Sequence, residues 1–377
     1  MNAVNIDDLR KLARRRLPRV VFEFIDGGSQ DEVTLRANQS DFSAWRFLPR
    51  TLTDIQQRDQ SVELFGERYA SPLILAPTGL AGIVARKGEL QAVRAASRAN
   101  LPYCLSAMAT RSIEEIADAA DASNWFQLYV LRDRGLTKAF IERARAANCS
   151  ALVLTVDTKL QGPRERDIRN GFTVPPRFGF ATLADFALHW RWLFDVGLGP
   201  KIKFRNFEGT DVNADDAMTI TQFIANQWDL SVSWQDVEWF KAAWGGPVLL
   251  KGLLNPDDAA KAVDAGVDGV IVSNHGGRQL DGAISAIAAL PAVTKAVAGR
   301  VPIILDGGVR RGADVIKAIA LGATACMIGR PWLYGLAAGG EAGVDRALTI
   351  LHDEIDVALG LLGCASLASV DRSVLVD

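Results

Sequence analysis

Eight short runs of apolar residues recur along the chain, and a polar residue or a glycine closes each one. Runs of this length are typical of strands buried on both faces of a sheet. Alanine-rich segments with helical spacing separate most of them, as at 88–99, 113–120, 256–265 and 312–321. The runs are PLILAPTG (72–79), PYCLSAM (102–108), WFQLYV (125–130), ALVLTVD (151–157), PVLLKG (247–252), GVIVSN (269–274), VPIILDGG (301–308) and TACMIG (324–329).

Eight strands that alternate with helices predict an α/β fold, the TIM (β/α)8 barrel. A doubly wound open sheet would show the same alternation and stays open as the second architecture, although eight repeats favour closure. A chain of 377 residues suits one large barrel or two ordinary domains. We expect a single domain over residues 1–377.

One connection is much longer than the others, because residues 158–246 separate the fourth and fifth predicted strands. Connections of this length are usually functional or disordered. This one is too rich in aromatic residues for disorder, so we expect a lid, a docking surface or both. Within it, 177–205 combines phenylalanines and tryptophans with flanking Arg and Lys, a mixture that suits a segment lying in a membrane interface. An oligomer contact or a packed lid would have the same composition.

Charge and cysteine usage exclude several classes of protein. Lys plus Arg total 42 and Asp plus Glu 44, a formal net charge of −2, so no nucleic-acid partner is expected. The four cysteines form no CxxC pair and no cluster with histidine, which argues against a disulfide framework or a metal site and favours a reducing compartment.

No apolar stretch reaches the roughly 18 residues that a membrane span needs. The basic N-terminus lacks the features of a signal peptide, and Ile6, Leu9, Ala13 and Leu17 predict an amphipathic helix there. We therefore expect a cytoplasmic protein, free or held against a membrane from the cytosolic side.

Polar side chains stand where the predicted strands end, which is where barrels of this kind place their active sites. Simple tolerance of polar residues at strand ends would explain one or two of them, but not a set that includes Lys, His and Arg. The set is Thr78, Ser106, Gln127, Tyr129, Thr155, Asp157, Lys251, His275, Asp306 and Arg330.

The segment 273–281, SNHGGRQLD, carries the strongest chemical signal. Of the three histidines, His189 lies in the long connection and His352 in a C-terminal helical stretch, and only His275 follows a strand on a glycine-flanked loop. Imidazole is the usual proton-transfer group near neutral pH. Arg278, three residues later, can hold a carboxylate through two parallel hydrogen bonds.

Asp157 ends the fourth predicted strand, where it can orient a base and stabilise its protonated form. Arg164 follows seven residues later and would complete a clamp of two guanidinium groups with Arg278. Taken alone, Arg164 fits a surface salt bridge better.

Glycine-rich turns follow the last two strands, at 306–312 and 328–331, and each contains arginine. Such turns expose backbone N–H groups beside a helix start, which is the usual phosphate site of these barrels. The GxGxxG fingerprint of dinucleotide-binding folds is absent from the strand-to-helix turns. A phosphate-bearing cofactor without that fingerprint indicates FMN rather than NAD, and Lys251 would then favour negative charge on reduced flavin.

These motifs together resemble the FMN-dependent L-2-hydroxy acid oxidases and dehydrogenases, and the resemblance covers nearly the whole chain. It rests on APTG (76–79), WFQLY (125–129), TVD (155–157), KG (251–252), SNHGGRQLD (273–281), DGGVRRG (306–312) and IGRP (328–331). The family implies a (β/α)8 fold, bound FMN, oxidation of a 2-hydroxy acid to the 2-keto acid, and a homotetramer.

The resemblance also implies the roles of individual residues. His275 would be the base and Asp157 its partner, while Tyr129, Arg164 and Arg278 would contact the carboxylate and hydroxyl of the substrate. The flavin and ribityl contacts would be Pro77, Thr78, Gly79, Ser106, Gln127, Thr155, Lys251 and Ser273. The ribityl and phosphate groups would be held by Asp306, Gly307, Gly308, Val309, Arg310, Gly329 and Arg330.

Phe24 is a departure from the family pattern, which has a tyrosine there that hydrogen-bonds the substrate carboxylate. The change removes a hydrogen bond worth about 0.5–1.5 kcal/mol, or supplies an apolar wall for a bulkier substrate. Met108 stands where short-chain oxidases tend to have Trp, and a flexible Met leaves room for an aryl group. Both residues favour an aromatic or medium-sized acid, with mandelate and lactate as the two candidates.

Family members differ in electron acceptor. Gly79 resembles the dehydrogenases, since the glycolate oxidase branch typically carries Ala there. The 177–205 segment is similar to the membrane-docking insertion of bacterial L-lactate and (S)-mandelate dehydrogenases. We expect a peripheral protein on the cytoplasmic face of the inner membrane that passes electrons to a quinone. The alternatives are an oxidase that makes H2O2, a flavin-binding isomerase or synthase without net redox turnover, and a non-catalytic membrane-docking or scaffold protein.

Overall fold

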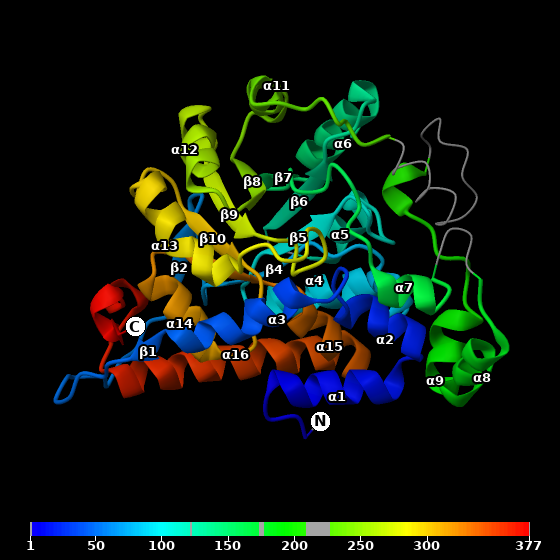
Figure 1. Cartoon of the computed structure of the whole chain (residues 1–377), viewed down its shortest axis with the longest axis horizontal. Helices are drawn as coiled ribbons and strands as arrows, with labels where there is room; N and C mark the ends of the chain where they lie inside the picture. The colour runs from blue at the N-terminus through cyan, green and yellow to red at the C-terminus, as the bar shows by residue number, and fades with distance from the viewer. Residues whose placement is uncertain (1, 121–122, 173–176, 209–226, 377) are drawn as a thin grey trace.

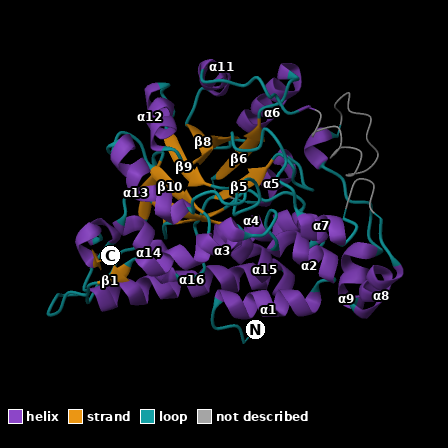
Figure 2. Ribbon diagram, viewed as in Figure 1, coloured by secondary structure: helices purple, strands orange, loops and turns teal. Residues whose placement is uncertain are grey.

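The computed structural model describes residues 2–120, 123–172, 177–208 and 227–376. Eight parallel strands close into a barrel in the order β10-β11-β4-β5-β6-β7-β8-β9, visible at the centre of Figures 1 and 2. The strands are β4 (Leu73–Leu75), β5 (Tyr103–Ser106), β6 (Asn124–Tyr129), β7 (Ala151–Thr155), β8 (Val248–Leu253), β9 (Gly269–Ser273), β10 (Ile303–Asp306) and β11 (Ala325–Ile328). Each coincides with one predicted run, which β6 and β8 exceed by one residue, at Asn124 and at Leu253. The barrel prediction is therefore confirmed, and the doubly wound sheet was wrong.

Helices cover the outside of the barrel, and the four predicted helical segments are α4, α5, α12 and α14. Local sequence fixes their starts: Ser112 and Glu115 form a reciprocal capping box at α5, and Asn255 caps α12 ahead of Pro256. The outer helices are α4 (Gly88–Arg98), α5 (Ile113–Ala119), α6 (Arg134–Ala146), α11 (Gln235–Trp244), α12 (Pro256–Asp264), α13 (Ala286–Val297), α14 (Gly312–Ala320), α15 (Arg330–Gly339) and α16 (Glu341–Leu362).

A short hairpin closes the amino-terminal end of the barrel. Its strands are β2 (Val62–Leu64) and β3 (Glu67–Tyr69), and Leu64 and Tyr69 are buried with the side chains that fill the barrel interior. Phe65 at its turn packs edge-on against Trp125 of β6, with ring centroids 5.6 Å apart. The hairpin therefore leaves the carboxyl ends of the strands as the open end of the barrel.

Three N-terminal helices precede the barrel: α1 (Ile6–Arg16), α2 (Arg19–Asp26) and α3 (Val33–Ser40). The predicted amphipathic helix is α1, whose Ile6, Leu9 and Ala13 are buried. Asp26 at the end of α2 accepts two hydrogen bonds from Arg10 and one from the Tyr334 hydroxyl of α15. Farther along, β1 (Arg46–Phe47) pairs with β12 (Leu375–Val376), so the C-terminal strand joins the segment that follows the N-terminal helices.

The long connection forms helices in its described parts: α7 (Glu165–Arg169), α8 (Phe180–Leu188), α9 (Trp190–Trp192) and the π-helical turn η3 (Leu193–Gly197). In Figure 1, α8 and α9 form a lobe beside α2. Its aromatic side chains divide between two faces. The outer face exposes Phe180, Trp190 and Phe194, which are 94%, 57% and 68% accessible.

The inner face of this lobe packs toward the barrel. Phe186 stacks on Trp192 with centroids 5.3 Å apart and meets Phe178 edge-on, and the Trp192 indole donates a hydrogen bond to the backbone oxygen of Ile83. Across the described ranges, none of the helices has the length and apolar character required to cross a membrane.

Candidate active site

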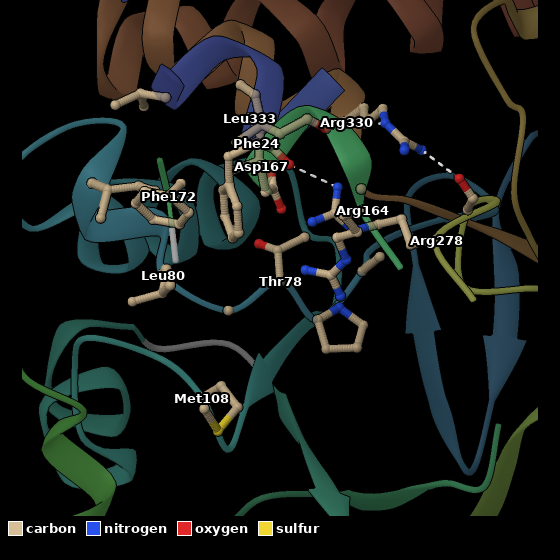
Figure 3. A pocket seen from close by; sticks show the side chains of 18 of the residues that line it. Phe24, Thr78, Leu80, Met108, Arg164, Asp167, Phe172, Arg278, Arg330 and Leu333 are labelled. Carbon is tan, nitrogen blue, oxygen red and sulfur yellow. Dashed lines mark hydrogen bonds between the residues drawn. The ribbon is translucent and has the colours of Figure 1, made fainter. Parts of the chain in front are cut away.

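A cavity of about 960 Å³ opens at the carboxyl ends of the barrel strands. It reaches from the strand ends to α2 and to the inner face of the α8–α9 lobe, and Figure 3 shows one part of its wall. The predicted site residues that line it are Phe24, Pro77, Thr78, Gly79, Met108, Tyr129, Arg164, Lys251, His275, Arg278, Asp306, Gly307, Gly308, Val309, Arg310, Gly329 and Arg330.

Four other predicted flavin contacts are not in the cavity lining. One is Ser273, described below, and the other three lie in the barrel wall. Ser106 Oγ donates to Gln127 Oε1 at 3.0 Å, and Gln127 Nε2 donates to Thr155 Oγ1 at 2.9 Å, which links β5, β6 and β7. All three side chains are buried. Their contact with flavin stays a prediction, and their established effect is to order the wall beneath the cavity.

Ser273, the last residue of β9, joins a buried charge pair to the base. Its hydroxyl donates to Asp306 Oδ2 at 2.7 Å and accepts from Lys251 Nζ and from the His275 N–H, both at 3.0 Å. Lys251 Nζ also lies 2.7 Å from Asp306 Oδ2. Burial lowers the pKa of Lys251, but Asp306 and Asp157 outweigh it and raise that pKa, so Lys251 is an ammonium at neutral pH.

His275 and Asp157 form a pair beside the cavity. The imidazole Nδ1 lies 3.1 Å from Asp157 Oδ1, and His275 has a left-handed backbone with φ of 59°. Burial lowers the pKa of His275 more than Asp157 raises it, so the imidazole is neutral at pH 7. Burial opposes ionisation of Asp157, but the contact with His275 lowers its pKa overall. Because an ionised carboxylate only accepts, Nδ1 carries the proton and Nε2 keeps its lone pair.

The arginines occupy the wall shared with α2. Arg278 Nη1 donates to the backbone oxygens of Phe24 and Gly27, at 2.7 and 3.0 Å. Arg164 is half-buried, and its buried Nε has no hydrogen-bond partner among the described residues. Figure 3 shows both guanidinium groups beside Thr78 and Asp167. The predicted clamp therefore has an unsatisfied donor in the cavity.

The remaining wall suits a phosphate-bearing cofactor. Gly307 and Gly308 have φ of 135° and 82°, a conformation that exposes backbone N–H groups, and α15 begins at the cavity with Arg330. Arg310 lines the same side. The Thr78 hydroxyl is buried without a hydrogen-bond partner in the described part of the chain. These donors and cations fit the ribityl and phosphate groups of FMN.

Sequence reasoning missed several residues of this cavity. Asp167 on α7 lines it near Arg164 and Arg278, and burial raises its pKa despite both arginines. Phe172 packs against Phe24 with ring centroids 4.9 Å apart. Trp228, which contacts Tyr129 at 6.4 Å between centroids, comes from the far end of the insertion. Among these residues, only Asp167 had a signal in the sequence, because it follows the predicted clamp residue Arg164 by three positions.

The other two histidines lie elsewhere. His189 pairs with Asp185 on α8, and His352 on α16 contacts Gln60. Within the described ranges, no group of three or more His, Cys, Asp and Glu side chains could hold a metal ion. Of the three histidines, His275 is the one that lines the cavity.

This chain is similar to known proteins both in sequence and in fold. Residues 13–377 match the FMN-dependent dehydrogenase family. The L-lactate dehydrogenase of Alcaligenes faecalis is 44% identical over 98% of this chain and 97% of its own. That of Caulobacter vibrioides (strain NA1000 / CB15N) is 43% identical over the same shares.

Solved structures agree. The monotopic membrane protein (S)-mandelate dehydrogenase superposes with a TM-score of 0.95 at 39% identity, covering 100% of both chains. A mandelate oxidase with (S)-2-phenylpropionate superposes at 0.84 and 37% identity, covering 100% of this chain and 98% of that one. The chain belongs to the FMN-dependent dehydrogenase family.

Proposed function

We propose that this protein oxidises an (S)-2-hydroxy acid to the 2-keto acid and passes the electrons to a membrane quinone. The main support for the proposal is the His275–Asp157 pair beside the cavity. The same cavity is lined by two arginines and by the glycine-rich turns that suit a phosphate group. Relatives named for L-lactate and (S)-mandelate oxidation, at 44% and 39% identity, support the substrate class.

Each side chain has a task in this proposal. Arg164 and Arg278 bind the substrate carboxylate and so fix the α-carbon in the cavity. The neutral His275 takes a proton on Nε2, and the ionised Asp157 stabilises the imidazolium that results. The Tyr129 hydroxyl, whose pKa burial raises, stays protonated and donates to the substrate.

FMN bound in the cradle would accept the two electrons of the oxidation. Lys251, a buried ammonium paired with Asp306, would supply positive charge near that cofactor and so favour negative charge on it. The proton that His275 accepts comes either from the α-carbon or from the hydroxyl, and both routes need the same side chains.

Apolar side chains around the clamp favour an aromatic or medium-sized acid. Phe24, Phe172, Leu80 and Met108 line this part of the cavity, and Figure 3 shows them around the space beside Arg164. A phenyl group would gain contacts with these walls that the methyl group of lactate would not. Mandelate is therefore the substrate we favour over lactate.

The α8–α9 lobe supports a peripheral site on the cytoplasmic face of the inner membrane. Phe180, Trp190 and Phe194 are exposed, and the Arg191 guanidinium lies over the Trp190 ring at 5.2 Å. Exposed aromatics beside cations suit the interface of an anionic membrane. The cavity reaches the inner face of the same lobe, which would bring a quinone to the flavin.

Anaerobic mixing of the FMN-loaded protein with (S)-mandelate, with L-lactate and with their opposite enantiomers tests the proposal. Bleaching of the flavin absorbance by an (S) acid alone is expected. No bleaching with any acid would contradict it and would favour an isomerase or synthase. Stoichiometric H2O2 in air, with no rate gain from quinone, would identify an oxidase instead.

A further inference from the structure

We infer that Asn38, on α3 outside the barrel, is a positioning residue that holds two active-site loops in one fixed relation. These are the base loop (274–285), which carries His275, and the phosphate loop (306–311). The inference rests on the proposed function for the role of His275, and on the family for bound FMN. Neither the sequence motifs nor the cavity lining includes Asn38.

The main support for this inference is a reciprocal pair of hydrogen bonds between two side-chain amides. Asn38 Nδ2 donates to Asn274 Oδ1 at 2.8 Å, and Asn274 Nδ2 donates back to Asn38 Oδ1 at 2.7 Å. The two residues are 2% and 6% accessible. Asn274 directly precedes His275, so this pair fixes the backbone from which the base extends.

Backbone partners determine which way each amide points. The Gly277 N–H donates to Asn274 Oδ1 at 3.1 Å, and the Ile284 oxygen accepts from Asn274 Nδ2 at 3.1 Å. The Ala286 N–H donates to Asn38 Oδ1 at 3.3 Å. All four hydrogen-bonding positions of the Asn274 amide are therefore used, and neither amide can be flipped without losing backbone hydrogen bonds.

The helix also touches both loops directly. A Cβ added at Gly308 would lie 1.7 Å from the backbone oxygen of Asn38, and one at Gly277 would lie 2.7 Å from the backbone of Leu35. The base loop in turn caps the helix, because Asp281 accepts from the N–H groups of Val33 and Thr34. The backbone of α3 therefore lies in close contact with the backbones of both the base loop and the phosphate loop.

A substitution at Asn38 can test this arrangement through a pH-dependent defect, which a general loss of packing would not produce. In Asn38→Asp the ionised carboxylate cannot donate to Asn274 Oδ1, so two acceptors face each other in a buried site. The protonated acid has one O–H and one C=O and reproduces the amide pair. Burial raises the pKa of such a carboxyl group. The defect should therefore be small at low pH and grow as the pH rises through that pKa.

Two quantities are measured from pH 5 to 9, each as the ratio of Asn38→Asp to wild type at the same pH. One is the Kd of the apoprotein for FMN, from flavin fluorescence quenching, and the other is the rate constant of anaerobic flavin reduction. We expect the ratio of each to depart from unity by roughly tenfold or more at high pH and to return toward unity at low pH. Other ionisable groups on the surrounding elements, Asp41, Asp281, Asp306 and Lys317 among them, are common to both proteins and cancel.

Gln39→Glu is the matched control, because it makes the same amide-to-carboxylate change on the next, exposed residue of α3. Its ratios should stay near one throughout. Ratios for Asn38→Asp that equal those of the control, or that depart from one equally at every pH, overturn the inference.

If Asn38→Asp does not give folded protein, Asn38→Ser replaces it. The shorter neutral side chain should lower the reduction rate constant and weaken FMN binding, each roughly tenfold, whereas Gln39→Ser should change neither. KM should rise as well, because the base loop also carries Arg278 of the clamp. An unchanged rate constant overturns the inference. Failure of the proposed function would give a different result from failure of this inference. If the proposed function is wrong, no 2-hydroxy acid reduces the flavin of the wild type, but the FMN affinity of Asn38→Asp relative to wild type still tests the role of Asn38.

Discussion

The guanidinium of Arg278 lies over the ring of Phe24, 5.2 Å from its centroid, while Nη1 of the same arginine donates to the Phe24 backbone oxygen. The arginine is thus held to α2 through the ring and through the main chain. Substitution of the Phe24 side chain leaves the backbone hydrogen bond in place, so this position can be changed without releasing Arg278.

Phe24→Tyr should tighten substrate binding. The added hydroxyl supplies a donor beside the carboxylate clamp, and one neutral hydrogen bond is worth about 0.5–1.5 kcal/mol, which corresponds to a KM lower by roughly two- to tenfold. Steady-state KM for L-lactate and (S)-mandelate checks this. Phe24→Leu is the companion variant and should raise KM, since it removes the cation–π contact. An unchanged KM in Phe24→Tyr would mean that the ring edge does not face the substrate.

Asp157→Asn should slow flavin reduction about a hundredfold while FMN stays bound, because the imidazolium loses its counter-charge. Stopped-flow reduction under anaerobic conditions measures the change. Asp167→Asn is the matched control. It removes a carboxylate from the same cavity, next to Arg164 and Arg278, and should change KM more than the reduction rate. Equal rate losses in both variants would argue against a specific Asp157–His275 pair.

The reduction rate should fall as the pH falls through the pKa of His275, because only the neutral imidazole accepts a proton. Burial lowers that pKa below its ordinary value of 6.5, so the decline should be centred below pH 6.5. The Asp157 carboxylate raises the pKa, and Asp157→Asn should therefore move the decline to still lower pH. Single-turnover rates at saturating substrate give both profiles, and a decline centred above pH 7 would contradict the assignment.

Substitution of the outer face of the α8–α9 lobe should release the protein from lipid. The triple variant Phe180→Ser, Trp190→Ser, Phe194→Ser removes three exposed aromatics, each worth about 1.5–3 kcal/mol when buried. Co-sedimentation with phosphatidylglycerol vesicles should fall at least tenfold. Leu52→Ser is the control, since Leu52 is fully exposed a few residues after β1, which Figure 1 places far from α8. Unchanged sedimentation of the triple variant would contradict the membrane proposal.

Gly277→Ala should destabilise the protein far more than Gly282→Ala. Both glycines lie in the base loop with φ of 73° and 80°, and a left-handed alanine costs about 1–2 kcal/mol at either. Only at Gly277 would the new methyl meet the backbone of Leu35, at 2.7 Å, while nothing lies within 4 Å at Gly282. We expect a further ~1–3 kcal/mol at Gly277 from this overlap. Thermal unfolding of the two variants gives the difference, and equal Tm values would contradict it.

The barrel was predictable because most positions of its strands are apolar and a polar residue or a glycine closes each run, and this pattern depends only on neighbouring residues. The β2–β3 hairpin was not predicted, since three-residue strands such as Val62–Leu64 show no usable periodicity. The pairing of Phe47 with Leu375 joins residues from opposite ends of the chain, which one sequence cannot reveal.

The site was predictable where a residue combines reactive chemistry with a strand end, as His275 and Lys251 do. Asn38 was missed because its importance comes from Asn274, which is distant in the sequence. Asp167 was missed although it follows Arg164 by three residues, because its contact with Arg278 depends on the fold. The aromatic content of the insertion was evident, but not that Phe186 and Trp192 face inward while Phe180 and Phe194 face outward. That division depends on how the helices of the lobe pack.

The hairpin that closes the amino-terminal end has a consequence for kinetic order. In the described part of the chain, the cavity opens at the other end of the barrel, at the carboxyl ends of the strands. If the hydroxy acid and the electron acceptor both enter there, each would exclude the other while bound. Under the proposed function, the two substrates would then bind one after the other, in a double displacement, and the keto acid would leave before the acceptor enters. Each substrate in excess would then inhibit the half-reaction of the other, so turnover would be fastest when neither saturates the shared entrance.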